Sequence, residues 1–241
     1  DVCSSDLLAG HSLGEYSALV AAEAMSLADA VKLVHLRGKL MQSAVPQGTG
    51  AMAAILGLAD EKVIELCQKV NASAAGQGSV EAANYNAQGQ VVIAGSTALV
   101  QQVMAEAKEQ SGKAIALPVS VPSHCTLMKP AAEKFAEALE QTAIELPRIP
   151  VIQNVNAEIA TDVAQLRQAL TAQLYQSVQW TRTMQYLQDE GVQYVVECGP
   201  GTVLSNLAKR LPNIEKAFAI DSKARMEDAL NAVLVAEGKI A

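Results

Sequence analysis

The sequence predicts an α/β protein with a large domain over residues 1–46 and 119–241 and a small subdomain inserted over residues 47–118. Short apolar strand segments alternate with amphipathic helical segments along the chain, which is the pattern of a layered α/β fold. Breaks rich in glycine and proline bracket the central stretch. The 241 residues are 50% hydrophobic, which is enough to fill a large core and a smaller one.

The large domain opens with a strand and two helices. Residues 7–9 are predicted to end a buried strand, and residues 15–24 to form the helix that follows it. Apolar residues recur at helical spacing over residues 27–42, and Ser26 precedes them as an N-cap. The polar start of the chain does not extend the strand. We therefore expect residues 1–6 to be foreign and the large domain to be incomplete at its N-terminus.

Residues 47–118 form a complete unit of their own. Its segments occur in the order strand, helix, strand, strand, helix, strand, which is the order of a ferredoxin-like βαββαβ subdomain. The expected elements are a strand over 51–56, a helix over 60–71, strands over 80–85 and 90–95, a helix over 98–110 and a strand over 113–117.

The remaining segments return to the large domain and complete its alternating α/β pattern. The expected elements are a helix over 130–141, a strand over 151–154, helices over 163–174 and 181–190, a buried strand over 193–197 and a helix from Thr202.

The composition excludes several classes of protein. The formal charge is -7 and aromatic residues make up 3%, which argues against a nucleic-acid surface built on phosphate contacts and base stacking. No stretch approaches the roughly 18 apolar residues of a membrane span, and the chain does not open on a signal peptide. The four cysteines contain no CxxC pair, so neither a metal site nor a disulfide framework is predicted. We expect a soluble cytoplasmic protein that binds neither nucleic acid nor membranes.

The Gly-x-Ser-x-Gly run over residues 10–14 lies between the first strand and the first helix, which is the setting of a nucleophile elbow. Such a turn is strained and tightly packed, and it presents the hydroxyl of Ser12 to a cleft at the helix N-terminus. The backbone N–H of Leu13 would then point at a developing oxyanion. Enzymes of α/β-hydrolase-like fold share this elbow, and we expect that fold for the large domain.

A serine nucleophile needs a base, and the chain contains three histidines. His11 adjoins Ser12, where neighbouring side chains diverge, and is better explained as a packing residue of the turn. His35 lies on the helix over 27–42 and is most simply a partly exposed helix residue. His124 follows an apolar extended segment and precedes a helix, a usual place for a side chain that projects into a cleft. His124 is the candidate base by elimination, and a purely structural histidine is the alternative.

Arg37 lies on the apolar face of the helix over residues 27–42. That face is formed by Ala30, Leu33, Val34, Arg37, Leu40 and Met41. An arginine in an apolar stripe is costly to bury unless its guanidinium meets an anion. The residue pattern leaves two interpretations open. Arg37 either extends to solvent or to an acid elsewhere in the fold, or it is a bidentate clamp for a substrate carboxylate.

Together with several later motifs, these residues resemble the malonyl-CoA:acyl carrier protein transacylases of bacterial type II fatty acid synthesis. The resemblance extends in order from about Leu7 to the region of Arg210. The motifs are Gly10-His11-Ser12-Leu13-Gly14-Glu15-Tyr16, Arg37 twenty-five residues after the serine, Asn84-Tyr85-Asn86 with Gln90-Val91-Val92-Ile93-Ala94-Gly95, Val121-Pro122-Ser123-His124, Gln173-Leu174-Tyr175 with Val178-Gln179-Trp180, and Glu197-Cys198-Gly199-Pro200-Gly201.

The resemblance implies an activity and a role for each matching residue. Ser12 takes malonyl from malonyl-CoA as an ester and passes it to the phosphopantetheine thiol of acyl carrier protein. His124 is the general base and acid, and the main-chain carbonyl of Gln173 holds its other ring nitrogen. Arg37 pairs with the free carboxylate of malonyl. Two further residues fall where the family lines its acyl pocket: Met41 and Ser123.

The resemblance also implies the partners. These are malonyl-CoA and a transiently bound acyl carrier protein, with no metal or cofactor, and we expect a monomer. Lys129 and Lys134, near the His124 segment, are candidates for contact with an acidic carrier protein. A desolvated Arg37 would discriminate against acetyl, which leaves the cation unpaired.

The chain departs from the family pattern at its start. The family begins with a strand and a Gly-Gln-Gly-Ser-Gln loop, whose glutamine N–H helps Leu13 to form the oxyanion hole, and this chain has no such segment. We therefore expect half of the hole and at least one central strand to be missing, with impaired folding or turnover. Ser177 and Cys198 stand where relatives commonly have proline and valine.

Three other functions have to be weighed. A serine hydrolase of the α/β-hydrolase type shares the elbow, but its histidine normally lies near the C-terminus, and no histidine follows His124 here. The acyltransferase domain of a polyketide synthase is similar in fold and chemistry, and the ending of the chain at Ala241 favours a free-standing enzyme. A non-catalytic protein that retains the fold would not be acylated at Ser12.

Overall fold

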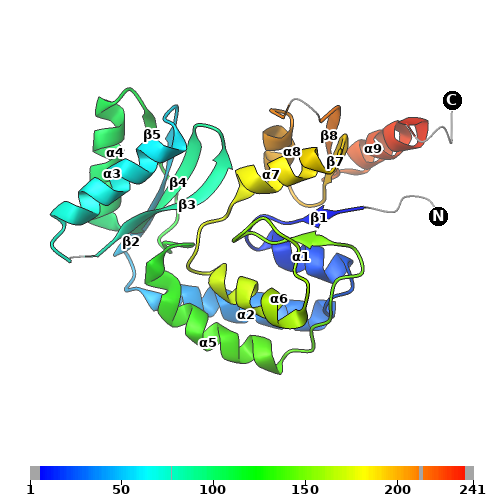
Figure 1. The fold of residues 1–241 in the computed structure, drawn as a ribbon, viewed down its shortest axis with the longest axis horizontal. Helices are drawn as coiled ribbons and strands as arrows, with labels where there is room; N and C mark the ends of the chain where they lie inside the picture. Colours follow the sequence, from blue (N-terminus) through cyan, green and yellow to red (C-terminus); the bar gives the residue numbers. More distant parts are fainter. Residues whose placement is uncertain (1–5, 77, 212–213, 237–241) are drawn as a thin grey trace. The chain divides into compact units, whose positions relative to one another are not determined.

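A computed structural model describes residues 6–76, 78–211 and 214–236 of the chain. Two compact units are present, Asp1–Thr183 and Met184–Ala241, and each is described by itself. Helices and strands alternate along both, which confirms the predicted α/β class (Figure 1). The expectations about the first five residues and about the ending at Ala241 lie outside the described residues.

The first unit contains every helix and strand predicted for it, close to the expected bounds. In chain order its elements are β1 (Leu8–Ala9), α1 (Gly14–Ala21), α2 (Leu27–Ala44), β2 (Gly50–Leu56), α3 (Asp60–Ser73), β3 (Val80–Ala87), β4 (Gln90–Ser96), α4 (Thr97–Glu109), β5 (Lys113–Ala116), the 3₁₀ helix η1 (Thr126–Met128), α5 (Lys129–Gln141), β6 (Val151–Ile152), α6 (Val163–Ala172) and α7 (Trp180–Asp189), which continues into the second unit. Ser26 caps α2 as predicted, because its side-chain oxygen accepts a hydrogen bond from the N–H of Asp29.

The strands β2 to β5 form an antiparallel sheet in the order β3-β4-β2-β5. The helices α3 and α4 lie side by side on one face of this sheet (Figure 1). Ile55, Val63, Val70, Ile93 and Val103 are fully buried between the helices and the sheet. Burying each such side chain contributes about 1.5–3 kcal/mol before the conformational entropy is counted. The sheet and its two helices therefore have a hydrophobic core of their own.

The opposite face of the same sheet fixes the segment that carries the candidate base. Cys125, directly after His124, is fully buried there among apolar side chains of β2, β3 and β4. A second segment runs alongside β3, where the N–H of Tyr85 donates to the carbonyl of Val178 and the N–H of Val178 donates to that of Ala83. The segment around Cys125 and the segment around Val178 are therefore both fixed against the sheet.

The helices α1, α2, α5 and α6 pack around the second core of the first unit. Its centre includes the edge-on ring pair Tyr16 and Phe135, 6.2 Å apart, and the fully buried Leu19 and Leu170. β1 pairs with β6 in parallel. Because parallel strands end at the same edge, the turn after β1 and the chain after β6, which includes Asn154, come together there.

The second unit contains β7 (Tyr194–Glu197), α8 (Val203–Ala208), β8 (Lys216–Ala219) and α9 (Lys223–Ala236). β7 and β8 pair in parallel, and β8 and α9 were not predicted. The prediction of a buried strand over 193–197 is wrong in its burial, because Val196 is 41% exposed and no residue of β7 is fully buried. Across both units, none of the described helices combines the length and the apolar character that a membrane crossing requires.

Candidate active site

The turn between β1 and α1 has the strained geometry of a nucleophile elbow. Ser12 has a φ of +52°, in the left-handed region that L-residues avoid at a cost of roughly 1–3 kcal/mol. The N–H of Leu13 donates to no acceptor among the described residues, and it is therefore free for an oxygen of a bound acyl group. The turn thus presents a hydroxyl and a main-chain donor side by side.

Only one of the two glycines of the motif is required by packing. A Cβ on Gly10 would lie 2.0 Å from the carbonyl carbon and oxygen of Gly14, whereas a Cβ on Gly14 would meet no atom within 4 Å. The packing of the turn therefore requires glycine at position 10 but not at position 14.

Gly10→Ala should destabilise the protein by at least about 3 kcal/mol, because backbone cannot yield to the added methyl as a side chain could. Urea unfolding followed by circular dichroism measures this loss. The matched control is Gly14→Ala at the first residue of α1, which should be neutral or stabilising by up to about 1 kcal/mol. Equal effects of the two changes would contradict the packing argument.

Asn154 braces the strained turn from the end of β6. Its Nδ2 donates to the carbonyl of Gly10 and its Oδ1 accepts from the N–H of Ser12, both at 2.6 Å. The two bonds hold the backbone on either side of His11. The side chain of Asn154, which is only 1% exposed, therefore maintains the positive φ of Ser12. Asn154 was not among the predicted site residues, although polar residues that follow a short apolar strand are a recognisable signal.

The structure brings Ser12, His124 and Gln173 together in one line of hydrogen bonds. The Oγ of Ser12 lies 2.8 Å from the Nε2 of His124, and the Nδ1 of His124 lies 2.6 Å from the main-chain oxygen of Gln173. A carbonyl oxygen can only accept, so Nδ1 carries the proton and Nε2 is free to accept the proton of the serine. This arrangement can activate a serine for attack on a carbonyl carbon.

Burial lowers the pKa of His124 from 6.5 to about 3, and the neighbouring Arg37 cation acts in the same direction. The hydrogen bond to Gln173 raises the pKa and only partly opposes them. The imidazole is therefore neutral at neutral pH, as a general base must be. An unfolded histidine binds a proton below pH 6.5 and the buried one does not, so this residue reduces stability as the pH falls from 6.5 toward 3.

Arg37 reaches the same place from α2. Its Nη2 donates to the Oγ of Ser12 at 3.0 Å and to the Oε1 of Gln173 at 3.1 Å. The side chain is 6% exposed, so it does not extend to solvent, and no carboxylate lies within ion-pair distance of it among the described residues. A buried guanidinium beside the nucleophile without an acid to neutralise it favours the interpretation as a carboxylate clamp.

The other predicted site residues lie nearby or face elsewhere. Met41 is buried one turn after Arg37 on α2, and Ser123 is half-buried next to His124. The Nε2 of His11 bonds Asn86 at 2.8 Å, and its ring packs against Trp180. His35 is exposed.

The side chains of Glu15 and Gln173 complete the site, and the sequence analysis gave neither a role. The Nε2 of Gln173 donates to the carbonyl of Ser12 at 3.0 Å and to the Oε2 of Glu15 at 2.7 Å. That Oε2 also accepts from the N–H of Asn154 at 3.2 Å. Glu15 stands in the helix that follows the elbow, and a lone acid before the buried Tyr16 was the available signal.

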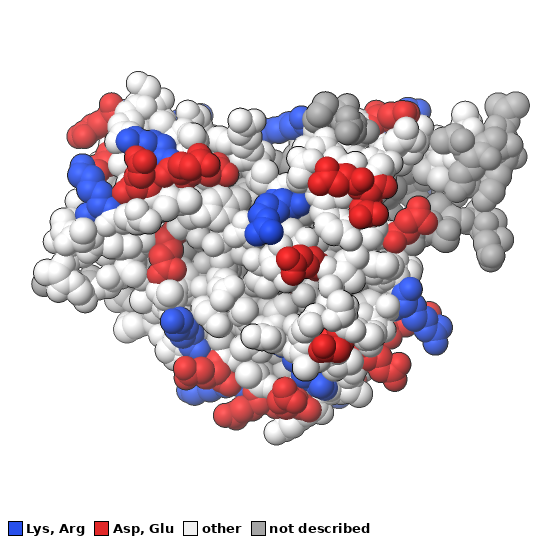
Figure 2. All heavy atoms as spheres, in the orientation of Figure 1, with Lys and Arg blue, Asp and Glu red and all other residues white. Residues whose placement is uncertain are grey.

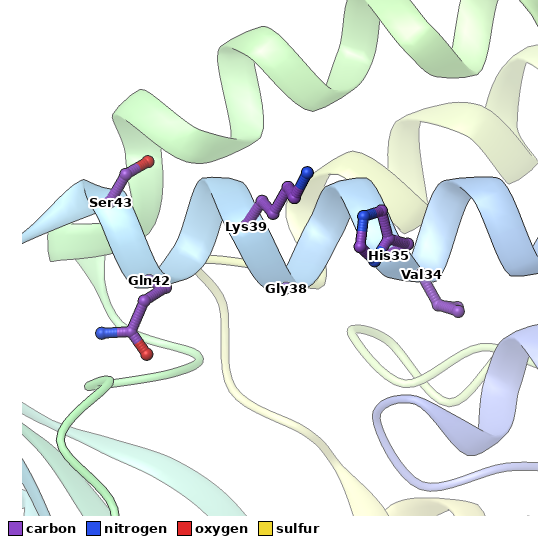
Figure 3. Close-up of a pocket in the computed structure, with 6 residues that line it drawn as sticks. All are labelled: Val34, His35, Gly38, Lys39, Gln42 and Ser43. Carbon is purple, nitrogen blue, oxygen red and sulfur yellow. The ribbon is translucent and has the colours of Figure 1, made fainter.

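A hollow along α2 is a separate feature. It measures about 670 Å³ and lies along α2, lined by Val34, His35, Gly38, Lys39, Gln42 and Ser43. Figure 3 shows that all six come from this one helix, and neither Ser12, His124 nor Arg37 is among them. It contributes nothing to the site described above.

The chain is similar to known acyl transferases. A family model described as "Acyl transferase domain" matches residues 3–229. The chain is 48% identical to "Malonyl CoA-acyl carrier protein transacylase" of Salmonella typhimurium over 93% of its own length and 72% of that protein. It is 45% identical to the protein of the same name from Bacillus subtilis, over 93% of this chain and 70% of that protein.

Solved structures show the same similarity. The crystal structure of FabD from Acinetobacter baumannii matches with a TM-score of 0.95 and 87% identity, over 97% of this chain and 74% of that one. A malonyl-transacylase in complex with a type II PKS acyl-carrier protein matches with a TM-score of 0.91 and 44% identity, over 95% of this chain and 74% of that one.

Proposed function

The chain belongs to the malonyl CoA-acyl carrier protein transacylases of the acyl transferase family, and from this we propose that it carries malonyl from malonyl-CoA to acyl carrier protein as an ester on Ser12. It is an acyltransferase of fatty acid biosynthesis, and neither a serine hydrolase nor a polyketide synthase domain is favoured over that activity. One observation carries the mechanistic proposal. The Oγ of Ser12 lies within 3.0 Å both of a neutral imidazole and of a buried guanidinium that has no carboxylate within ion-pair distance among the described residues.

In the first half-reaction, the Oγ of Ser12 attacks the thioester carbon of malonyl-CoA while the Nε2 of His124 takes the hydroxyl proton. The carbonyl of Gln173 supports the imidazolium that forms. The N–H of Leu13 donates to the oxyanion of the tetrahedral intermediate. The carbon–sulfur bond then breaks, the thiolate of coenzyme A takes the proton from His124, and malonyl remains on the serine.

In the second half-reaction, the phosphopantetheine thiol of acyl carrier protein gives its proton to His124 and attacks the ester carbon. The oxygen of Ser12 leaves and recovers its proton from His124, so the enzyme returns to its starting state. A thioester is already an activated acyl group, and a serine with an imidazole is sufficient for both steps. We therefore propose that no metal or cofactor takes part.

Arg37 gives the reaction its selectivity in this proposal. Its guanidinium pairs with the free carboxylate of malonyl, in the pocket to which Met41 and Ser123 contribute. Acetyl would leave the buried cation without an anion, and removing one partner of a buried pair typically costs about 3–5 kcal/mol. The clamp thus discriminates by leaving the wrong substrate with an unpaired charge.

We also propose a finer description of the fold. The element order and the strand order β3-β4-β2-β5 support a ferredoxin-like subdomain over residues 47–118, inserted into an α/β-hydrolase-like large domain formed by residues 1–46 and 119–241. The strained strand–turn–helix at Ser12 supports the second assignment. We propose in addition that the protein is a monomer and that it acts in the cytoplasm.

Lys129 and Lys134 are the proposed contacts for the acidic carrier protein. Both are exposed on α5, and the Nζ of Lys129 lies 5.8 Å from the ring centre of Tyr175. Lys129 also lines a hollow of about 410 Å³ that reaches the segment after Gln173. On the face seen in Figure 2, acidic and basic side chains are interspersed over α3 and α4. That part of the surface shows no basic patch that would compete with the two lysines for an acidic carrier protein.

Intact-mass spectrometry of the protein with malonyl-CoA tests the function. We expect a malonyl adduct that peptide mapping assigns to Ser12, and its loss to the carrier thiol when phosphopantetheinylated acyl carrier protein is added. Carrier protein without phosphopantetheine is the control. Hydrolysis of a simple ester without transfer to the carrier would support the serine hydrolase instead, and the absence of any adduct would support a non-catalytic protein.

A further inference from the structure

Glu15 is a buried acid that neither the proposed acylation nor the proposed transfer uses. It lies in the first turn of α1 and is 1% exposed. Burial raises the pKa of its carboxyl to about 7, while the hydrogen bond from Gln173 opposes that shift. A carboxyl is rarely fully buried unless it is paired or hydrogen-bonded, so the partners of Glu15 indicate what it does.

The oxygen atoms of Glu15 have unequal surroundings. Oε2 accepts from the Nε2 of Gln173 at 2.7 Å and from the N–H of Asn154 at 3.2 Å. Oε1 has no partner among the described residues. Glu15 therefore accepts through one oxygen only, and the shorter of its two bonds comes from the amide nitrogen of Gln173.

The carboxamide of Gln173 has a donor end and an acceptor end, and its surroundings fix which end points where. Its Nε2 faces two acceptors, the Oε2 of Glu15 and the carbonyl of Ser12. Its Oε1 faces the Nη2 of Arg37 at 3.1 Å. Reversal of the amide would set a donor against the donors of Arg37, so an acceptor at Glu15 keeps the oxygen turned toward the guanidinium.

Arg37 depends on that oxygen for its position. Its guanidinium donates hydrogen bonds to the Oε1 of Gln173 and to the Oγ of Ser12. Its Nε has no partner among the described residues. The ring of Tyr16 lies 5.9 Å from the guanidinium carbon and adds a weaker contact. During catalysis the serine oxygen becomes part of the ester, which leaves the Gln173 oxygen as the fixed anchor.

We propose that Glu15 is a positioning residue for acyl selectivity, which acts through the side chain of Gln173 to hold Arg37 where the malonyl carboxylate binds. This inference rests on the proposed function and extends it to a residue that touches neither substrate nor base. The main-chain oxygen of Gln173, which orients His124, belongs to the peptide group and is not turned by the carboxamide. Loss of Glu15 should therefore affect recognition of malonyl more than the chemistry of acylation.

The test compares Glu15→Met with Glu15→Gln in the full-length protein. Methionine keeps the length of the side chain and removes the acceptor, whereas glutamine retains an oxygen that can take the place of Oε2. We expect Glu15→Met to lower the ratio of malonyl to acetyl kcat/KM by about tenfold or more, mainly through the KM for malonyl-CoA. Glu15→Gln should stay within about threefold of the wild-type ratio.

The outcomes separate the inference from the function beneath it. A merely structural role for Glu15 would lower malonyl and acetyl transfer together and leave their ratio unchanged, and that result would overturn the inference. If the wild-type protein itself transfers no malonyl, the proposed function fails instead. Gln173→Met interrupts the same relay from its other end and serves if Glu15→Met does not fold. It should lower the ratio to the same extent, and an unchanged ratio there would also overturn the inference.

A double variant tests whether the two residues act in series. If Glu15 works through Gln173, Glu15→Met combined with Gln173→Met should show the selectivity of Gln173→Met alone. Multiplied losses in the double variant would mean that Glu15 acts by another route, which contradicts the proposal.

Discussion

Ser12→Ala is expected to abolish the malonyl adduct and to lower transfer to acyl carrier protein by about 10⁴- to 10⁶-fold, the range seen when a serine nucleophile is removed. The reason is that no other hydroxyl of the part of the chain that the structure describes bonds both the Nε2 of His124, 2.8 Å from the Oγ, and the Nη2 of Arg37, 3.0 Å from it. Intact-mass spectrometry after incubation with malonyl-CoA measures the adduct. Radiolabelled malonyl transfer measures the turnover.

The control for this change is on the helix that follows the turn. Ser17 is exposed on α1, so Ser17→Ala alters a hydroxyl without touching the site and should retain full labelling. Thermal unfolding should show that both variants are folded. Alanine has a Cβ as serine does, so neither substitution changes the backbone strain at the positive φ of residue 12. An adduct that persists in Ser12→Ala would place the covalent chemistry on another residue.

Arg37→Ala has the second largest expected effect. It should lower malonyl kcat/KM by about 100-fold or more, because the substrate carboxylate then enters a buried site without its cation. Acetyl transfer should rise, since the unpaired guanidinium that disfavours acetyl has been removed. Steady-state transfer from malonyl-CoA and from acetyl-CoA to the same carrier protein gives both values.

Two further variants make the result specific. Arg37→Lys keeps a positive charge but not the planar fork, and it should recover only part of the malonyl activity. Lys39→Ala removes a neighbouring exposed cation from the same helix and should leave the ratio of malonyl to acetyl unchanged. An unchanged ratio in Arg37→Ala would remove Arg37 from acyl recognition.

The sequence predicted most elements of the first unit because each has a local signal. The N-cap at Ser26, the helical spacing in α2 and the alternating strands of residues 50–116 all depend on residues close together in the chain. The second unit was predicted less well. β7 was expected to be buried from its apolar residues alone, although burial depends on what else packs against the strand.

The site was predictable where a residue is chemically unusual in its local sequence. Ser12, His124 and Arg37 stand out in the sequence as a candidate nucleophile, a candidate base and a cation on an apolar helix face. Asn154 and Glu15 do not stand out, because their roles depend on partners 142 and 158 residues away. Only the parallel pairing of β1 with β6 and the folding back of the segment at Gln173 bring those partners together.

The acceptor that orients His124 is a main-chain oxygen, and that has a genetic consequence. A catalytic aspartate can be deleted by a single codon change, but every amino acid at position 173 supplies a carbonyl. A saturation scan of the gene would therefore report on the side chain of Gln173 but never on the carbonyl that orients His124. Only a change to the backbone itself, such as an ester bond introduced in place of the peptide after residue 173, would weaken that oxygen as an acceptor and make its contribution measurable.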